Sequence, residues 1–112
     1  MRLKSEIWVQ AFTRRCNGEG KYCTIVAKGA AEAGAVFVMV NRLDGRFHLL
    51  GPAPGPAFDE QGDRRFIEEL PFPATESEVN ALLNRRKKFD SDIWIVEVED
   101  RNGTAGLTPA QV

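Results

Sequence analysis

The segment over residues 51–65, GPAPGPAFDEQGDRR, sets the strongest limit on how this chain can fold. It contains three prolines and three glycines and has almost no apolar periodicity. Proline lacks a backbone donor and glycine weakens extended pairing, so this segment does not lie inside a sheet. We expect a long surface loop, of a length that is usually either functional or mobile, with the folded elements on either side of it.

The chain before this loop begins with a helical pattern. Ser5 is a good N-cap, Glu6 suits the positive end of a helix, and apolar side chains follow at helical spacing. The predicted helix runs from Ser5 to about Cys16, where Asn17 and Gly18 end it. The residues expected on one face of this helix are Ile7, Trp8, Ala11, Phe12 and Arg15.

Three strand patterns follow the first helix. Residues 22–28 (YCTIVAK), 35–42 (AVFVMVNR) and 47–51 (FHLLG) are rich in β-forming side chains. The small-residue segment GAAEAG joins the first two, and Asp44-Gly45 before the third is a strong signal for a two-residue hairpin. We predict three consecutive antiparallel strands, each paired with the next, in a meander.

Beyond the loop the chain carries a short strand, a helix and a final strand. FIEEL at residues 66–70 is the short strand. Thr75 and Glu78 form the capping-box pattern at the start of the second helix, which continues to Phe89. IWIVEV at residues 93–98 is the last strand, with alternate side chains on opposite faces.

These elements predict an α+β fold in one domain over residues 1–100. An antiparallel sheet of about five strands packs with two helices, in the order helix, strand, strand, strand, strand, helix, strand. The tail over residues 101–112 carries turn residues without a pattern, and we expect it to fray. The expected core consists of Ile7, Trp8, Phe12, Ile25, Val38, Leu49, Val79, Leu82, Leu83, Trp94 and Val96.

Composition narrows the classes of function. Hydrophobic residues make up 43% and charged residues 28% of the 112, which is typical of a domain that folds alone. The formal net charge of -1 creates no field that would draw the chain to nucleic acid or a membrane surface. The N-terminus lacks the apolar core of a signal peptide, so we expect a cytoplasmic protein without a membrane segment or cofactor.

The residues that could support catalysis are few. Glu97 and Glu99 share a strand face at roughly 7 Å spacing, so with Asp100 they are candidate metal ligands or acid and base groups. Charged residues that alternate on the solvent side of an antiparallel sheet are the commoner cause of such a pattern. His48 is the only histidine, which argues against a multi-histidine metal centre. No pattern in the sequence indicates a catalytic residue.

The cysteines and the basic residues suggest two further functions, a redox pair and nucleic-acid binding. Cys16 and Cys23 fit a pair of reduced thiols, or a redox pair if their side chains face each other across the helix-to-strand connection. A second candidate is weak nucleic-acid binding by a basic rim, which would form if helix ends and strand ends converge. It would bring Arg85, Arg86, Lys87 and Lys88 together with Arg14, Arg15, Lys21, Lys28 and Arg42. The simpler interpretation is that these cations oppose the negative end of the helix dipole.

The strands favour a binding protein over an enzyme. If both helices packed on one side of the sheet, the other side would expose an apolar patch that includes Phe37, Met39 and Ile95. Such a patch would bind a partner or a second copy of the chain. We therefore expect a non-enzymatic interaction domain that self-associates. The alternative arrangement, with one helix on each face or the Pro-rich loop over the sheet, would remove that patch.

Several strings in the sequence resemble a family of short bacterial proteins known as domain of unknown function 1491. They are SEIWVQAFTRR, VAKGAAEAGAVFV, NRLDG, LLGPAP and FDSDIWIVEVED, which together span most of residues 5–100. The resemblance implies a stand-alone intracellular domain of bacterial type. It implies no activity and no ligand.

Overall fold

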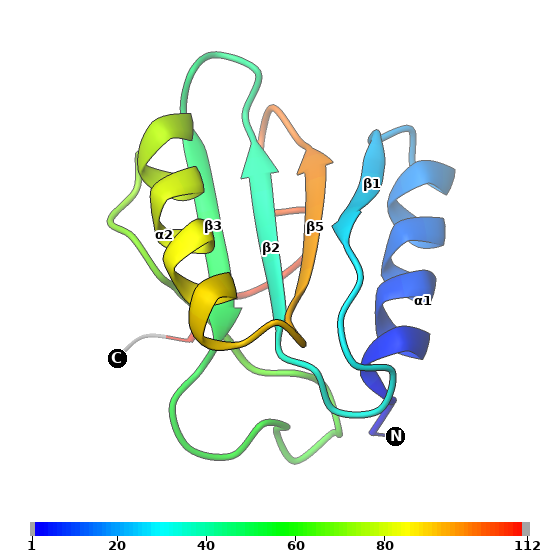
Figure 1. Cartoon of the computed structure of the whole chain (residues 1–112). Coiled ribbons are helices and arrows are strands. Elements are labelled where there is room, and N and C mark those ends of the chain that lie inside the picture. The colour runs from blue at the N-terminus through cyan, green and yellow to red at the C-terminus, as the bar shows by residue number, and fades with distance from the viewer. Residues whose placement is uncertain (1, 111–112) are drawn as a thin grey trace.

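The computed structural model describes residues 2–110 as two helices and five strands (Figure 1). All the predicted elements are present in the predicted order. Their bounds are α1 Ser5–Gly18, β1 Cys23–Ala27, β2 Val36–Asn41, β3 Phe47–Pro52, β4 Phe66–Glu68, α2 Glu76–Phe89 and β5 Trp94–Glu99.

The five strands form one sheet in the order β1-β5-β2-β3-β4. Strand β5 is antiparallel to β1 and parallel to β2, whereas the β2–β3 and β3–β4 pairs are antiparallel. The predicted α+β class is confirmed, but the predicted meander is wrong because β5 lies between β1 and β2. Strands β2 and β5 are buried along most of their length, which suits inner positions of a sheet covered on both faces.

The two helices cover opposite faces of the sheet (Figure 1). On one face α1 packs through Val9, Phe12 and Cys16 against the alternate valines of β2 and β5. On the other face α2 packs through Val79, Leu82 and Leu83. The sheet is therefore the middle layer of three, and each face has its own apolar core.

The predicted core is correct for most residues and wrong for Ile7, which is 47% exposed. Val9 takes its place, because the buried face of α1 follows Ser5, Val9, Phe12 and Cys16. Trp8 and Ile25 are half-buried and pack at the margin of the core. The fully or almost fully buried members of the predicted set are Phe12, Val38, Leu49, Val79, Leu82, Leu83, Trp94 and Val96.

The two helices begin in different ways. For α2 the predicted capping box is confirmed: Glu78 donates its backbone N–H to Thr75 Oγ1 at 3.1 Å, and Thr75 donates its own N–H to Glu78 Oε1 at 2.9 Å. For α1 the prediction is wrong, because Ser5 is the first helical residue and its hydroxyl donates to the carbonyl of Gly34 at 2.6 Å. Backbone carbonyls of the loop between β1 and β2 accept the first N–H groups of α1.

That loop is held close to the chain just before β5. Ala30 donates its N–H to the carbonyl of Asp92, and Trp94 donates its N–H to the carbonyl of Ala35. A Cβ added at Gly29 or Gly34 would overlap the carbonyl oxygen of Asp92. The two glycines of GAAEAG therefore permit the approach that places β5 between β1 and β2.

The Gly/Pro segment and the tail pack against the α1 side of the molecule. Strand β3 extends to Pro52, and an isolated bridge joins Phe58 to Arg64 inside the predicted loop. The tail, which we expected to fray, is attached over residues 101–110: Ala105 is buried, and Ala110 donates its N–H to the carbonyl of Phe66 at 2.7 Å. Residues 111–112 lie outside the described residues.

Candidate functional site

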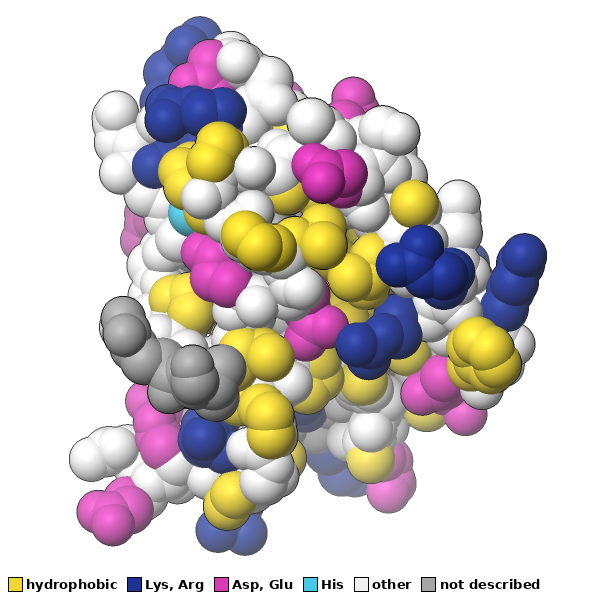
Figure 2. All heavy atoms as spheres, turned by 90° about the vertical axis from the view of Figure 1, so that its left-hand side faces the viewer, with side chains coloured by type: hydrophobic (Ala, Val, Ile, Leu, Met, Phe, Trp, Pro, Cys, Tyr) yellow, Lys and Arg dark blue, Asp and Glu magenta, His cyan; other side chains and the backbone are white. Residues whose placement is uncertain are grey.

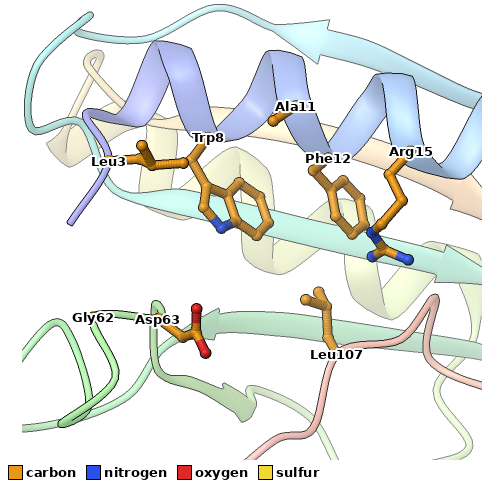
Figure 3. A pocket seen from close by; sticks show the side chains of 8 residues that line it. All are labelled: Leu3, Trp8, Ala11, Phe12, Arg15, Gly62, Asp63 and Leu107. Atoms are coloured by element: carbon orange, nitrogen blue, oxygen red, sulfur yellow. The ribbon is translucent and has the colours of Figure 1, made fainter. Parts of the chain in front are cut away.

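A cleft separates α1 from the Gly/Pro loop and the C-terminal tail (Figure 3). It consists of two adjoining cavities of about 250 Å³ and about 380 Å³ that share Trp8, Arg15, Asp63 and Leu107. We call it the α1 cleft. The first cavity is also lined by Leu3, Ala11, Phe12 and Gly62, and the second by Asp59, Arg64, Phe66, Gly106 and Thr108.

Aromatic rings form the apolar wall of the α1 cleft. Trp8 and Phe12 lie one turn apart on α1, and their rings stack with centroids 4.9 Å apart at 10°. Phe66 of β4 meets Trp8 at 5.4 Å and 45°. Leu107 of the tail faces this wall from the opposite side (Figure 3). Such a wall suits a flat apolar group, because stacking adds to the gain from burial.

Two arginines fix the walls of the α1 cleft. Arg15 donates from Nη2 to the carbonyl of Ala105 at 2.7 Å and from Nη1 to Glu19, so it ties α1 to the tail. Arg64 donates from Nη2 to Ser5 Oγ at 2.9 Å and to the carbonyl of Leu3. Its Nε is buried without a partner among residues 2–110, and burial lowers the pKa of the guanidinium.

Two aspartates stand in the loop that forms the opposite wall. Asp59 Oδ1 accepts the backbone N–H groups of Gln61 and Asp63, each at 2.9 Å, which fixes the turn. The carboxylate of Asp63 points toward α1 across the cleft (Figure 3). Over residues 2–110 this carboxylate has no hydrogen bond or ion pair. The α1 cleft thus has a free acceptor at Asp63 and the guanidinium groups of Arg15 and Arg64 in its lining.

Sequence reasoning missed this site for a physical reason. Trp8 and Phe12 have the spacing of an ordinary core face, and Phe12 does lie in the core, with Trp8 half-buried at its margin. Ser5 and Arg64, which contact each other, are 59 positions apart in the chain. The only signal available was the length of the Gly/Pro segment, which we had interpreted as a functional or mobile loop.

The acidic candidates lie on β5 and directly after it. Glu97 and Glu99 are half-buried on the α2 side of β5, whereas both carboxylate oxygens of Asp100 accept backbone N–H groups, from Asn102 and Ala105. Among the described residues, no group of three or more His, Cys, Asp or Glu side chains is arranged to hold a metal ion. The metal hypothesis therefore has no geometric support.

The basic candidates lie at the exposed end of α2. Arg86 pairs with Glu69 at 3.0 Å, and Arg85, Lys87 and Lys88 are exposed. The C-terminal ends of α1 and α2 lie at opposite ends of the molecule (Figure 1), so their cations do not converge. Figure 2 shows Lys and Arg side chains in separate groups on one face, with acidic and apolar side chains between them.

The apolar residues expected to bind a partner are buried. Phe37, Met39 and Ile95 are 2%, 5% and 6% exposed, because α2 packs over them. The condition for an exposed patch, both helices on one side of the sheet, does not hold. The arrangement with one helix on each face, which the sequence left open, is the one observed.

His48 and the two cysteines are also in the interior. His48 is buried on β3, with its Nδ1 2.7 Å from Glu68 Oε1, and Figure 2 shows only a small part of the imidazole. Cys16 and Cys23 are free thiols in the core under α1. Burial raises the pKa of both thiols, to about 11 for Cys16. Protonated thiols of this kind are poor nucleophiles.

The family model described as "Protein of unknown function (DUF1491)" matches residues 3–108. The chain belongs to this family. A protein of A. tumefaciens whose structure was determined in solution is 42% identical, with a TM-score of 0.81, and the match covers 99% of this chain and 98% of that one. A comparison with curated proteins finds no match.

Two structures of DUF1491 family proteins from Caulobacter crescentus share the fold. The crystal structure is 35% identical with a TM-score of 0.80 and covers the whole of both chains. The NMR structure is 36% identical with a TM-score of 0.77, covering 100% of this chain and 99% of that one. No helix within residues 2–110 of this DUF1491 member is long and apolar enough to cross a membrane.

Proposed function

We propose that this DUF1491 protein is a non-enzymatic binding domain whose α1 cleft takes a small zwitterion with a flat apolar group, of the type of an aromatic amino acid. One observation carries the proposal: a stacked aromatic wall faces a free carboxylate and stands beside two guanidinium groups, those of Arg15 and Arg64. The site contains binding groups of both signs.

Each part of such a ligand has a counterpart in the α1 cleft. The flat group lies against Trp8 and Phe12 in the more apolar cavity. The ammonium group lies at Asp63, where the free carboxylate accepts its hydrogen bonds. The carboxylate of the ligand lies toward Arg64 and Arg15. Two arginines and two aspartates line the second cavity, so their charges balance and a ligand of no net charge fits best.

Three probes test the match of charges. Phenylalanine carries both charges, 3-phenylpropionate lacks the ammonium group, and phenethylamine lacks the carboxylate. Two-dimensional ¹H–¹⁵N NMR of the labelled full chain should show shifts at Trp8, Asp63 and Leu107 with phenylalanine, and clearly weaker binding of the other two. Equal affinity for all three, or shifts away from the α1 cleft, would overturn the proposal.

A matched pair of variants separates the site from general charge effects. Asp63→Asn should weaken phenylalanine binding by about tenfold, the typical value of a hydrogen bond to a charged group. Glu60→Gln removes the same charge from an exposed residue of the same loop that does not line the cleft, so it should leave binding unchanged. A loss of the same size in both variants would point to long-range electrostatics instead.

Self-association stays a prediction that rests on the sequence alone. Burial of Phe37, Met39 and Ile95 removes the surface for which it was expected. Native mass spectrometry of the gently purified protein tests it and, in the same spectrum, reports any retained small molecule. A dimer would require another surface, and a monomer with a bound zwitterion would support the α1 cleft as the functional site.

A further inference from the structure

A second cavity, of about 280 Å³, lies at the C-terminal end of α2. The end of α2, the start of β2 and the end of β3 lie at the same end of the molecule (Figure 1). We call this hollow the α2 cavity. Apolar side chains make up most of its lining: Ala35, Phe37, Pro52 and Ile93. It has no lining residue in common with the α1 cleft.

The exposed ring of Phe89 stands at the edge of the α2 cavity. Phe89 is the last residue of α2 and belongs to the lining, yet it is 91% exposed. Tyr22, the next most exposed large hydrophobic residue among the described residues, is 64% exposed. Because the phenyl ring of Phe89 stays in water, the single chain gains almost nothing from its burial. Aromatic side chains in such positions are enriched where proteins bind one another.

The α2 cavity has the size and the lining that a phenyl ring requires. An apolar cavity of about 150 Å³ is enough to take up benzene. A ring that entered the α2 cavity would meet Phe37 and Ile93, each 2% exposed. It would also approach Arg86, whose guanidinium carbon lies 5.7 Å from the centre of the Phe37 ring. A guanidinium group beside an aromatic face attracts it.

The side chains on either side of Phe89 carry opposite charges. Lys88 precedes it and Asp90 follows it, and both are exposed. Neither forms an ion pair with any residue that the structure describes. Asp90 also lines the α2 cavity, and its Oδ1 accepts the N–H of Asp92 at 2.9 Å. A ring of Phe89 that came from a second copy would bring the adjoining Lys88 close to this carboxylate.

We propose that the α2 cavity binds the Phe89 ring of a second copy of this chain in a two-fold dimer. In a two-fold interface each contact between two different residues occurs twice, so the sequence Lys88-Phe89-Asp90 supplies both halves of the surface. Each ring fills the cavity of the other copy, and each Lys88 pairs with Asp90 of the other copy. This dimer does not depend on the α1 cleft, so either proposal can fail without the other.

The dimer is weak, because each copy contributes one aromatic anchor and one pair of charges at a small surface. Dissociation on dilution follows from mass action. At the micromolar concentrations of a denaturation experiment the chain is therefore monomeric. Removal of the Phe89 ring then leaves unfolding of the single chain unchanged, although it removes the dimer.

Sedimentation equilibrium of the full chain between about 10 µM and about 1 mM, a range that covers weak contacts, tests the proposal. The average mass should rise from that of one chain towards that of two. In ¹H–¹⁵N NMR the same dilution series should shift the signals of Phe89, Asp90 and Ile93. A mass of one chain throughout, a mass beyond two chains, or shifts confined to other residues would overturn the proposal.

A matched pair of variants tests the aromatic anchor. Phe89→Ala should abolish the rise in mass over the whole concentration range, because the cavity then has nothing to bind. Tyr22→Ala removes another exposed aromatic ring, just before β1, and should leave the association unchanged. Association that survives Phe89→Ala, or that is lost equally in both variants, would contradict the anchor.

An exchange of charges tests the pairing of Lys88 with Asp90. Lys88→Glu and Asp90→Lys each place like charges against each other at both contacts of the two-fold interface, so each variant alone should stay monomeric. An equal mixture of the two should form a heterodimer, because opposite charges then meet at both contacts. Recovery in the mixture also shows that neither variant lost association through unfolding. Single variants that associate like the parent, or a mixture that stays monomeric, would refute the pairing.

Discussion

The indole Nε1 of Trp94 donates a hydrogen bond to the carbonyl of Ala30 at 2.8 Å. The two residues are 64 positions apart, and the bond joins the first residue of β5 to the loop between β1 and β2. Trp94 is also 2% exposed in the core under α1. One side chain thus provides both apolar burial and a tie that helps to hold β5 in the middle of the sheet.

Replacement of Trp94 by alanine should lower the free energy of unfolding by about 3–5 kcal/mol, the usual cost of deleting a buried aromatic side chain. The loss comes from the vacated core volume and from the carbonyl of Ala30, which keeps only the longer hydrogen bond from the N–H of Gly34. Chemical denaturation of the two proteins measures it. Phe89→Ala is the matched control, since that ring is almost fully exposed, and it should unfold like the parent. Equal stability of Trp94→Ala and the parent would contradict the placement of Trp94.

The close approach of the β1–β2 loop to Asp92 can be tested with glycine substitutions. Gly29→Ala should destabilise the fold by several kcal/mol, because the new Cβ would overlap the backbone carbonyl of Asp92 and the loop would have to move. Gly18→Ala, at the end of α1, meets no atom within 4 Å and should be neutral or slightly stabilising. Thermal melts measure the melting temperatures of both variants and of the parent. Similar melting temperatures for the two variants would mean that the loop does not approach Asp92.

The capping box of α2 makes a pH-dependent prediction. Hydrogen bonds from Thr75 lower the pKa of Glu78 below its ordinary value of 4.5. A lowered folded-state pKa stabilises the protein above the ordinary value, and this contribution disappears as the pH falls through the lowered pKa. Thr75→Ala should cost about 1 kcal/mol near neutral pH, and the difference should shrink in acid. Denaturation series of parent and variant measure it, with Ser77→Ala in the first turn as the control. A difference that is independent of pH would mean that the Thr75 hydroxyl stabilises the helix only by accepting the backbone N–H of Glu78 and not through the Glu78 carboxylate.

Local features of this chain could be predicted from the sequence, and the order of strands could not. Thr75 and Glu78 are three positions apart, so their contact is encoded in a short pattern that any helix start of this kind repeats. The place of β5 depends instead on Gly29 and Gly34 meeting Asp92, which is a contact between distant segments. A strand pattern predicts the strand but not its neighbours, so a meander was the simplest choice.

The residues of the candidate site also come from distant segments, so local sequence patterns predict them only in part. The composition of the Gly/Pro segment predicted a long surface loop. This loop lies across the α1 cleft from Trp8, whose helical spacing indicated only a core residue. His48 and Glu68, whose side chains lie 2.7 Å apart, come from β3 and β4, and their separation of 20 positions matches no motif. Their relationship arises from strand register, in which Val40 is opposite His48 and Leu50 is opposite Glu68.

The thiol of Cys16 makes the protein sensitive to alkaline pH. Its pKa is raised from 9.0 to about 11, first by burial and then by the neighbouring thiol of Cys23. The folded protein therefore holds this proton more tightly than the unfolded chain, so stability falls as the pH rises from about 9 towards 11 and is unaffected by this group below that window. Cys16→Ala removes the titrating group, so its stability should fall less steeply over the same window. Chemical denaturation of both proteins at several pH values in this window gives the slope of the free energy of unfolding against pH. Exposed lysines titrate alike in both proteins, so their contribution cancels when the two slopes are compared. Parallel slopes would show that the thiol of Cys16 ionises in the folded protein as it does in the unfolded chain.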